Sequence, residues 1–196
     1  MNKQTPNLEN RPSLEQLEAE LVHEKYRSRY NKVFRSTVYA LIVVAAMAVL
    51  VATLWMPVLR IYGVSMTPSL EDGEIVLSVK DRTPKTGDII AFYYNNQVLV
   101  KRVIGTEEDW VSIEENGDVI LNGQILEEPY LTEKAYGDVT IDLPYQVQEN
   151  TLFVLGDHRS VSVDSRNQAV GCVAKDQIVG KIVFCIWPLG SFGPVN

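Results

Sequence analysis

The sequence predicts a mainly β domain, mostly antiparallel, that follows one transmembrane helix and a short cytoplasmic amphipathic helix. Residues 37–59 hold 23 positions without a charged residue. Beyond them, short apolar runs alternate with turn residues, as is typical of β structure. In the 196-residue chain we expect a cytoplasmic segment (1–36), a membrane anchor (37–59) and an extracytoplasmic domain (60–196).

The first helix is predicted from its start signal. Ser13 follows a proline, and Gln16 three residues later completes a capping box. Leucines then recur at helical spacing at positions 14, 17 and 21. They are too few to indicate a coiled coil.

The membrane anchor is predicted from length and flanking charge. The 23 uncharged residues suffice to cross a bilayer as a helix. A cleaved signal peptide is the alternative, but the apolar run is too long and 36 residues precede it. Five basic residues between Lys25 and Arg35 place the N-terminus in the cytoplasm. We expect Trp55 to lie at the far interface and Pro57 to end the helix.

The β domain is predicted from apolar runs and the turns between them. Asn95-Asn96 and Asn116-Gly117 are turn signals that separate pairs of strands. The expected strands cover residues 74–79, 89–94, 97–104, 111–113, 119–121, 151–155 and 178–187.

Charge and composition exclude several classes of protein. Residues 60–196 contain eleven basic and twenty acidic residues, so nucleic acid would be repelled. Twelve of the acidic residues lie in 106–150, which we interpret as an acidic β insertion with a solvated face. There is no phosphate-binding glycine loop or metal-ligand cluster, so no cofactor or metal is expected. Cys172 and Cys185 fit one disulfide or two free thiols equally well.

Ser65 lies in the stretch Gly63-Val64-Ser65-Met66-Thr67-Pro68-Ser69-Leu70. Glycine, proline and the bias that proline imposes on its predecessor favour a defined, non-helical turn. Such a turn suits a nucleophile and also an ordinary turn serine. Because six extended residues reach at most about 20 Å, Ser65 would lie close to the outer membrane surface.

Lys101 is the candidate base. Its expected strand is apolar on both faces, with Lys101 on one and Arg102 on the other, so one of the two cations should be at least partly buried. Burial would lower the pKa of Lys101, and a neutral amine can deprotonate a serine. A surface lysine with a buried stem is the alternative.

Other bases and nucleophiles are weaker candidates. His158 beside Asp157 permits a Ser-His-Asp triad, but neighbours in sequence are poorly placed to orient one another. The two cysteines lie in apolar surroundings without an activating partner. The polar run 156–166 is either a surface loop or a network that orients an active-site lysine.

Four segments together resemble the boxes of bacterial type I signal peptidases. They are Ser65-Met66-Thr67-Pro68-Ser69-Leu70, Gly87-Asp88-Ile89-Ile90, Lys101-Arg102-Val103-Ile104-Gly105, and Gly156-Asp157 through Asp164-Ser165-Arg166. They occur in the family's order behind a membrane anchor. Asn122-Gly123 and Glu128-Pro129-Tyr130 also resemble the family's linker between boxes.

The resemblance implies a β fold of the signal peptidase and LexA type and a serine endopeptidase. Ser65 would be the nucleophile and Lys101 the general base, with Ser162 hydrogen-bonded to Lys101 and with Asp164 and Arg166 in support. The site would sit in the extracytoplasmic domain.

The resemblance also implies the substrates and the oxyanion site. Membrane-bound preproteins with small residues before the cut would be cleaved at the outer face of the cytoplasmic membrane. Met66 would shape the cleft and the Ser65 N–H would stabilise the oxyanion. Gly63 stands where some members carry a serine as second donor, and His158 where asparagine is usual.

Two other classes remain as alternatives. A self-cleaving Ser/Lys regulator would carry a DNA-binding module and an Ala-Gly or Cys-Gly scissile bond, which this sequence lacks. A membrane-tethered binding domain would not need Ser65 near Lys101. The distance between the two side chains therefore discriminates enzyme from binding module.

Overall fold

The structure is a computed structural model that describes residues 13–81 and 83–195. The chain divides into two compact units, residues 1–51 and 52–196. The first twelve residues of the expected cytoplasmic segment lie outside the described residues.

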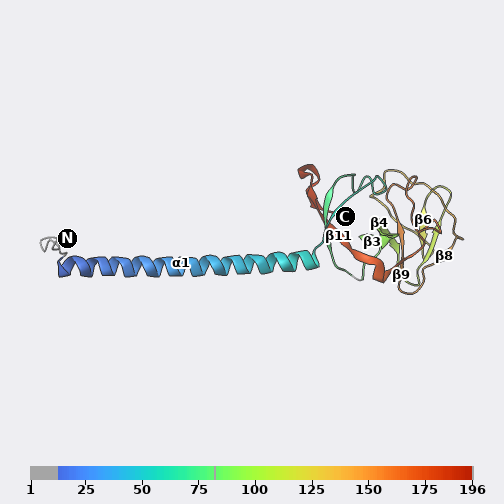
Figure 1. Ribbon diagram of the computed structural model, residues 1–196. Helices are drawn as coiled ribbons and strands as arrows, with labels where there is room; N and C mark the ends of the chain where they lie inside the picture. Colours follow the sequence, from blue (N-terminus) through green and yellow to red (C-terminus); the bar gives the residue numbers. More distant parts are fainter. Residues whose placement is uncertain (1–12, 82, 196) are drawn as a thin grey trace, which may run out of the picture. The chain divides into compact units, whose positions relative to one another are not determined.

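One continuous helix, α1 (Leu14–Trp55), replaces the two helices expected from the sequence (Figure 1). The capping box is present: the Ser13 N–H donates to Gln16 Oε1 and the Gln16 N–H to Ser13 Oγ. No glycine or proline occurs within α1, so nothing in the sequence breaks it between the polar and the apolar part. Among the described residues, it alone is long and apolar enough to cross a membrane.

The helix ends four residues before the expected Leu59. Pro57 lacks the N–H that a further turn would need. Its carbonyl accepts hydrogen bonds from the N–H and hydroxyl of Ser78, both at 2.9 Å. The residues that follow, Val58–Arg60, form a strand instead of helix.

The second unit is built from strands, and all of their pairings are antiparallel, as predicted. One sheet has the order β1-β2-β11-β3-β4-β9-β10, with β12 paired to β11, and a smaller sheet has the order β7-β6-β5-β8. The strands are β1 (Val58–Arg60), β2 (Ile75–Val79), β3 (Ile89–Tyr94), β4 (Gln97–Gly105), β5 (Trp110–Ile113), β6 (Val119–Leu121), β7 (Gln124–Ile125), β8 (Tyr145–Gln146), β9 (Thr151–Leu155), β10 (Val173–Ala174), β11 (Ile178–Trp187) and β12 (Gly193–Pro194). Two short 3-10 helices, η2 (Lys175–Gln177) and η3 (Leu189–Ser191), flank β11.

The expected strands agree with the observed ones to within one residue because their turns are strongly marked. Asn95 and Asn96 both take positive φ, 44° and 64°, as a tight two-residue hairpin turn requires. Gly117 has φ 87° between β5 and β6. The acidic insertion contains the smaller sheet.

Strand β4 organises the second unit. Residues 97–101 pair only with β3, Arg102 pairs with both β3 and β9, and Val103 and Gly105 pair with β9. In the order of the larger sheet, β4 lies between β3 and β9. The edge of residues 97–101 that faces away from β3 therefore has no strand beside it within the described part of the chain.

Candidate active site

Ser65 is held in a turn that both neighbours and core fix in place. Gly63 has φ 88°, a conformation that favours glycine, and its N–H donates to Asp72 Oδ1 at 2.7 Å. On the other side, Met66 and Leu70 are buried against β2, β3 and β11. The carbonyl of Ser65 accepts the His158 N–H at 3.1 Å. The turn expected from the sequence thus exists and is anchored at both ends.

Lys101 reaches this turn from β4. Its Nζ lies 2.7 Å from Ser65 Oγ, and the residue is only 3% exposed. Desolvation by burial lowers the pKa of Lys101 to about 8, although Asp164 and Asp157 act in the opposite direction. The amine is therefore partly neutral near physiological pH. Arg102 is buried as well. Both cations of this strand are therefore buried, whereas the sequence led us to expect only one.

A cleft of ≈500 Å³ opens beside the Ser65–Lys101 pair. One wall is the chain from Leu59 to Met66. The other is Gln97–Lys101 of β4, which pairs with β3 on one edge and lines the cleft on the other. Met66 lines the cleft and is 2% exposed. Strand β1 pairs only with β2 in the described residues. Two strand edges that have no further strand paired to them in the described part of the chain thus flank Ser65 and Lys101.

Arg102 ties the nucleophile turn to the segments around it. Its guanidinium makes two hydrogen bonds with Asp157, at 2.9 and 2.8 Å. It also donates to the carbonyl of Gly87 at 2.7 Å and to Ser69 Oγ at 3.1 Å. The ring of Tyr130 stacks on it, 3.8 Å from the guanidinium carbon. Arg102 belongs to one of the four segments that carry the resemblance, and it therefore contacts a residue of each of the other three.

A second buried arginine attaches the acidic insertion to the site. Arg159 donates through two guanidinium nitrogens to Glu128, and through Nε to the carbonyl of Gly156 at 3.1 Å. Tyr130 donates to the same carboxylate at 2.8 Å. Glu128 and Arg159 are buried. The sequence analysis assigned neither residue a role, since the match of a glutamate to an arginine 31 positions away leaves no local signal.

Asp164 and Arg166 pair as the sequence suggested. Arg166 donates twice to the Asp164 carboxylate, both at 2.8 Å, and Asp164 accepts the Gly156 N–H at 3.0 Å. Arg166 also donates to the carbonyls of Tyr136 and Arg159. The pair fixes the backbone of the loop at residues 156–166.

Ser162 does not make the expected hydrogen bond to Lys101. Its hydroxyl is buried and has no partner among the described residues. Lys101 Nζ instead meets Ser65 Oγ, while Ser162 packs against Gly156 so closely that a Cβ there would collide with it. Gly156 is thus required for the loop to approach the carbonyl of Ser65, which such a Cβ would meet at 2.6 Å.

The resemblance assigned the oxyanion site to the N–H of Ser65 and left open what Gly63 contributes. The Ser65 N–H has no acceptor within the described ranges, so it is available to a substrate carbonyl. Gly63 offers no side-chain donor, and its N–H is already bound to Asp72.

His158 lies beside the nucleophile turn and not in a triad. Its Nδ1 is 3.0 Å from Thr67 Oγ1 and 3.3 Å from the carbonyl of Val64. Asp157, its neighbour in sequence, is occupied by Arg102. Cys172 and Cys185 are free thiols, which decides between the two states that the sequence left open.

The sequence of this chain is similar to those of known proteins. Residues 34–187 match the family described as signal peptidase, peptidase S26. Signal peptidase IB of Staphylococcus aureus is 38% identical over 152 residues, which cover 67% of this chain and 78% of that protein. Signal peptidase I of Bacillus amyloliquefaciens is 34% identical over 163 residues, which cover 78% of this chain and 87% of that protein.

Among solved structures, a signal peptidase I from Enterococcus faecalis is 30% identical. It covers 50% of this chain and 96% of its own, with a TM-score of 0.44. The family match extends over most of the chain and includes all four segments that form the site. The chain belongs to the signal peptidase family, peptidase S26.

Proposed function

We propose that this signal peptidase cleaves its preproteins with Ser65 as the nucleophile and Lys101 as the general base. As a member of its family, the chain is a serine endopeptidase that removes signal peptides. The observation that carries the assignment of residues is the 2.7 Å separation of Lys101 Nζ and Ser65 Oγ. A non-enzymatic binding domain would have no need for a buried lysine at this distance from a serine.

The chemistry follows from the protonation state of the lysine. Neutral Lys101 takes the proton of Ser65 as Oγ attacks the scissile carbonyl, and then passes it to the leaving amine. The amine of Lys101 then activates the water that hydrolyses the acyl-enzyme. The Ser65 N–H donates to the developing oxyanion, an interaction of the kind whose loss costs about 2.7–4 kcal/mol in other enzymes.

The cleft suits an extended peptide. One wall includes the end of β1 and the other is the edge of β4 that faces away from β3, so an added strand can hydrogen-bond between them. Such backbone pairing accepts many sequences, which suits an enzyme with many preproteins. From the resemblance we infer that small residues precede the cut.

The membrane brings enzyme and substrate together. Signal peptidase I homologues are membrane-associated, and α1 fits a single span. We infer a cytoplasmic N-terminus from the basic residues that precede the span, so that residues 60–196 lie outside. Ser65 is ten residues from the end of α1, at most about 35 Å along the chain. A signal peptide anchored in the same membrane is within that reach.

Preprotein cleavage by the purified full chain tests the assignment. Ser65→Ala and Lys101→Ala should each lower kcat by at least a thousandfold, about 4 kcal/mol, while near-wild-type cleavage by either excludes the pair. The rate of the unchanged enzyme should rise with pH through about 8 as Lys101 loses its proton. Asp118→Ala, a change in the acidic insertion, serves as the control and should leave the rate and its pH profile unchanged.

A further inference from the structure

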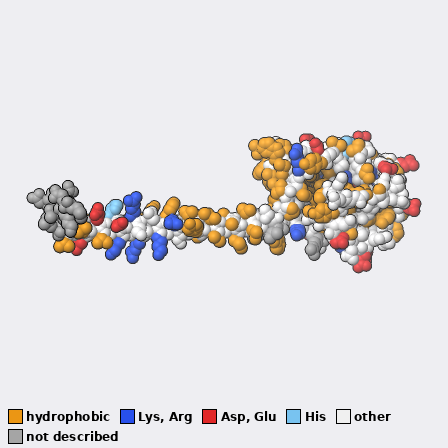
Figure 2. All heavy atoms as spheres, viewed as in Figure 1, with side chains coloured by type: hydrophobic (Ala, Val, Ile, Leu, Met, Phe, Trp, Pro, Cys, Tyr) orange, Lys and Arg blue, Asp and Glu red, His pale blue; other side chains and the backbone are white. Residues whose placement is uncertain are grey.

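The N-terminal unit carries a concentrated positive charge that peptide hydrolysis does not use. The five Lys and Arg residues of α1 are all exposed, and no acidic residue lies between the first and the last of them. We call them the basic girdle: Lys25, Arg27, Arg29, Lys32 and Arg35. Figure 2 shows their side chains on the polar part of α1, just before its hydrophobic part begins.

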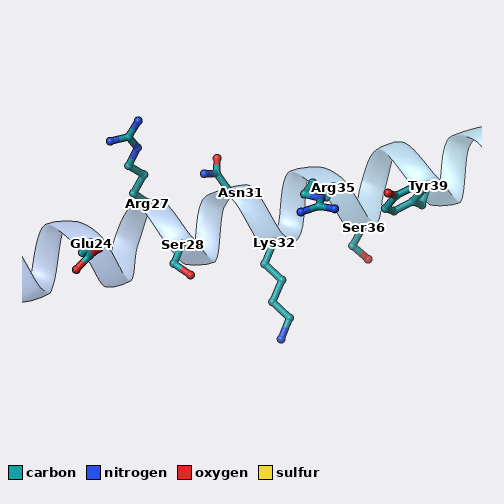
Figure 3. Close-up of a pocket in the computed structure, with 8 residues that line it drawn as sticks. All are labelled: Glu24, Arg27, Ser28, Asn31, Lys32, Arg35, Ser36 and Tyr39. Carbon is teal, nitrogen blue, oxygen red and sulfur yellow. The ribbon is translucent and has the colours of Figure 1, made fainter.

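The girdle surrounds the helix more than it forms one face. At 100° per residue, Lys25, Arg29 and Lys32 fall within about 60° of one another around the helix. Arg27 lies about 160° from Lys25, on the opposite side. Figure 3 shows Arg27 and Lys32 extending from opposite sides of α1, with Arg35 on a third side. The hollow drawn there is open helix surface, lined by residues of α1 alone.

Aromatic side chains fill the remaining sector. Tyr26, Tyr30 and Phe34 are exposed by 74%, 67% and 59%, and the rings of Tyr30 and Phe34 stack at 6.5 Å. A docked protein would cover one side of a helix. Cations and aromatic rings on all sides suit instead a layer that surrounds the helix, and the interface of a bilayer is such a layer.

The distances along the helix favour the headgroup layer. With a rise of 1.5 Å per residue, Arg35 lies about 3 Å and Lys32 about 8 Å before Thr37, where the uncharged stretch begins. Arg29 lies about 12 Å away and Lys25 about 18 Å away. Each interfacial layer is roughly 5–8 Å thick, and charges act about one Debye length, ~8 Å, beyond it. The effect should therefore be largest for Arg35 and Lys32 and smallest for Lys25.

We propose that the basic girdle binds the anionic phospholipid headgroups of the bilayer that α1 crosses. The proposal rests on α1 as a membrane span and is independent of the roles of Ser65 and Lys101. Positive charge opposite anionic headgroups is the complementarity that selects this partner.

The test uses the full chain in lipid nanodiscs, whose two leaflets are identical, so that orientation does not matter. Spin-labelled phosphatidylglycerol and phosphatidylcholine are compared by electron paramagnetic resonance for the fraction immobilised by the protein. We expect phosphatidylglycerol to be preferred about threefold or more in about 0.1 M salt. The preference should largely disappear in about 1 M salt, where the Debye length falls to ~3 Å.

Variants separate charge from structure. The triple variant R29Q/K32Q/R35Q should abolish the preference, R29K/R35K should retain it, and K25Q/R27Q should reduce it less than the triple variant. An unchanged preference in the triple variant overturns the proposal. A second result would also overturn it: inorganic phosphate suppresses the preference for phosphatidylglycerol, while chloride at the same ionic strength does not. The girdle would then be a site for soluble phosphate. Preprotein cleavage by the same preparations should remain, which distinguishes this outcome from a failure of the catalytic assignment.

Discussion

Two regions of the β unit treat charge in opposite ways. Around Lys101, three arginines are at most 1% exposed, and each makes two hydrogen bonds with a carboxylate: Arg102 with Asp157, Arg159 with Glu128, and Arg166 with Asp164. In the acidic insertion the pair Lys134–Asp118 keeps side-chain exposures of 41% and 21%. Pairs of opposite charge thus hold buried loops in place around Lys101, whereas in the acidic insertion such a pair lies on the solvated surface.

The difference explains how a lysine can be kept reactive among so many charges. Each buried arginine near Lys101 is matched by its own carboxylate, so the region holds little unbalanced charge. The opposing influences of Asp164, Asp157 and Arg166 on Lys101 therefore partly cancel, and desolvation decides the direction of its pKa. The buried pairs thus hold the loops around Lys101 in place without keeping its amine protonated.

The largest effect is expected when one buried pair is broken. Asp157→Ala leaves Arg102 as a buried cation without its carboxylate, which should destabilise the β unit by about 3–5 kcal/mol. Thermal unfolding of the full chain in detergent, followed by near-ultraviolet circular dichroism, measures this. Asp118→Ala removes the carboxylate of the exposed pair and is the matched control. Equal shifts in the two variants would contradict the distinction between the regions.

Removal of the unpaired lysine should have the opposite sign. The folded state lowers the pKa of Lys101 from 10.5 to about 8, so below pH 8 the charged amine opposes folding by roughly 3 kcal/mol. This cost decreases as pH rises from 8 and is absent above about 10.5. Lys101→Met should therefore be inactive but more stable at pH 7, with a gain that shrinks towards pH 10.

The pH dependence gives that prediction its control. Ser65→Ala also abolishes cleavage but leaves the lysine in place, so it should show no comparable gain at pH 7. A gain for Lys101→Met that is the same at pH 7 and pH 10 would mean that shape and packing, and not the buried charge, determine it.

His158 should have an intermediate effect, on rate more than on stability. Thr67 Oγ1 donates to the carbonyl of Val64 at 2.8 Å, and in the tautomer with a hydrogen on Nδ1 the ring of His158 donates to the same hydroxyl. An asparagine amide can donate from a similar place. His158→Asn should therefore keep kcat within about twofold, while His158→Leu should lower it about fivefold, the equivalent of one neutral hydrogen bond.

Steady-state kinetics on a preprotein measure this effect. KM should change little, because His158 does not line the cleft. A loss of kcat in His158→Asn as large as in His158→Leu would show that the imidazole ring itself, and not its donor, positions the turn.

What the sequence could predict follows the same division between local and distant interactions. Seven of the twelve described strands were predictable because Asn95-Asn96 and similar turns are local signals, whereas the two- and three-residue strands β1, β7, β8, β10 and β12 were missed. Ser65 and Lys101 stood out because four segments together resemble those of a known family, whereas the local patterns alone also allowed a turn serine and a surface lysine. The pairing of Arg159 with Glu128 was not predictable, because it depends on a match across 31 positions. The helix α1 ends at Trp55, earlier than expected, because the residues after Pro57 pair with β2. Hydropathy contains no information about such a strand partner.

The smallest effect is expected in the acidic insertion. Lys134→Ala removes the ion pair with Asp118, but exposed pairs contribute little, so the melting temperature should change by no more than ~2 °C. The segment at Lys134 and Ala135 is held by packing: a Cβ on Gly117 would lie 2.5 Å from the Ala135 nitrogen, and Gly117 has φ 87°. Gly117→Ala should therefore lower the melting temperature several times more than Lys134→Ala, although it removes no charge. If Lys134→Ala had the larger effect, exposed pairs would hold this sheet as buried pairs hold the catalytic loops, and the contrast between the two regions would fail.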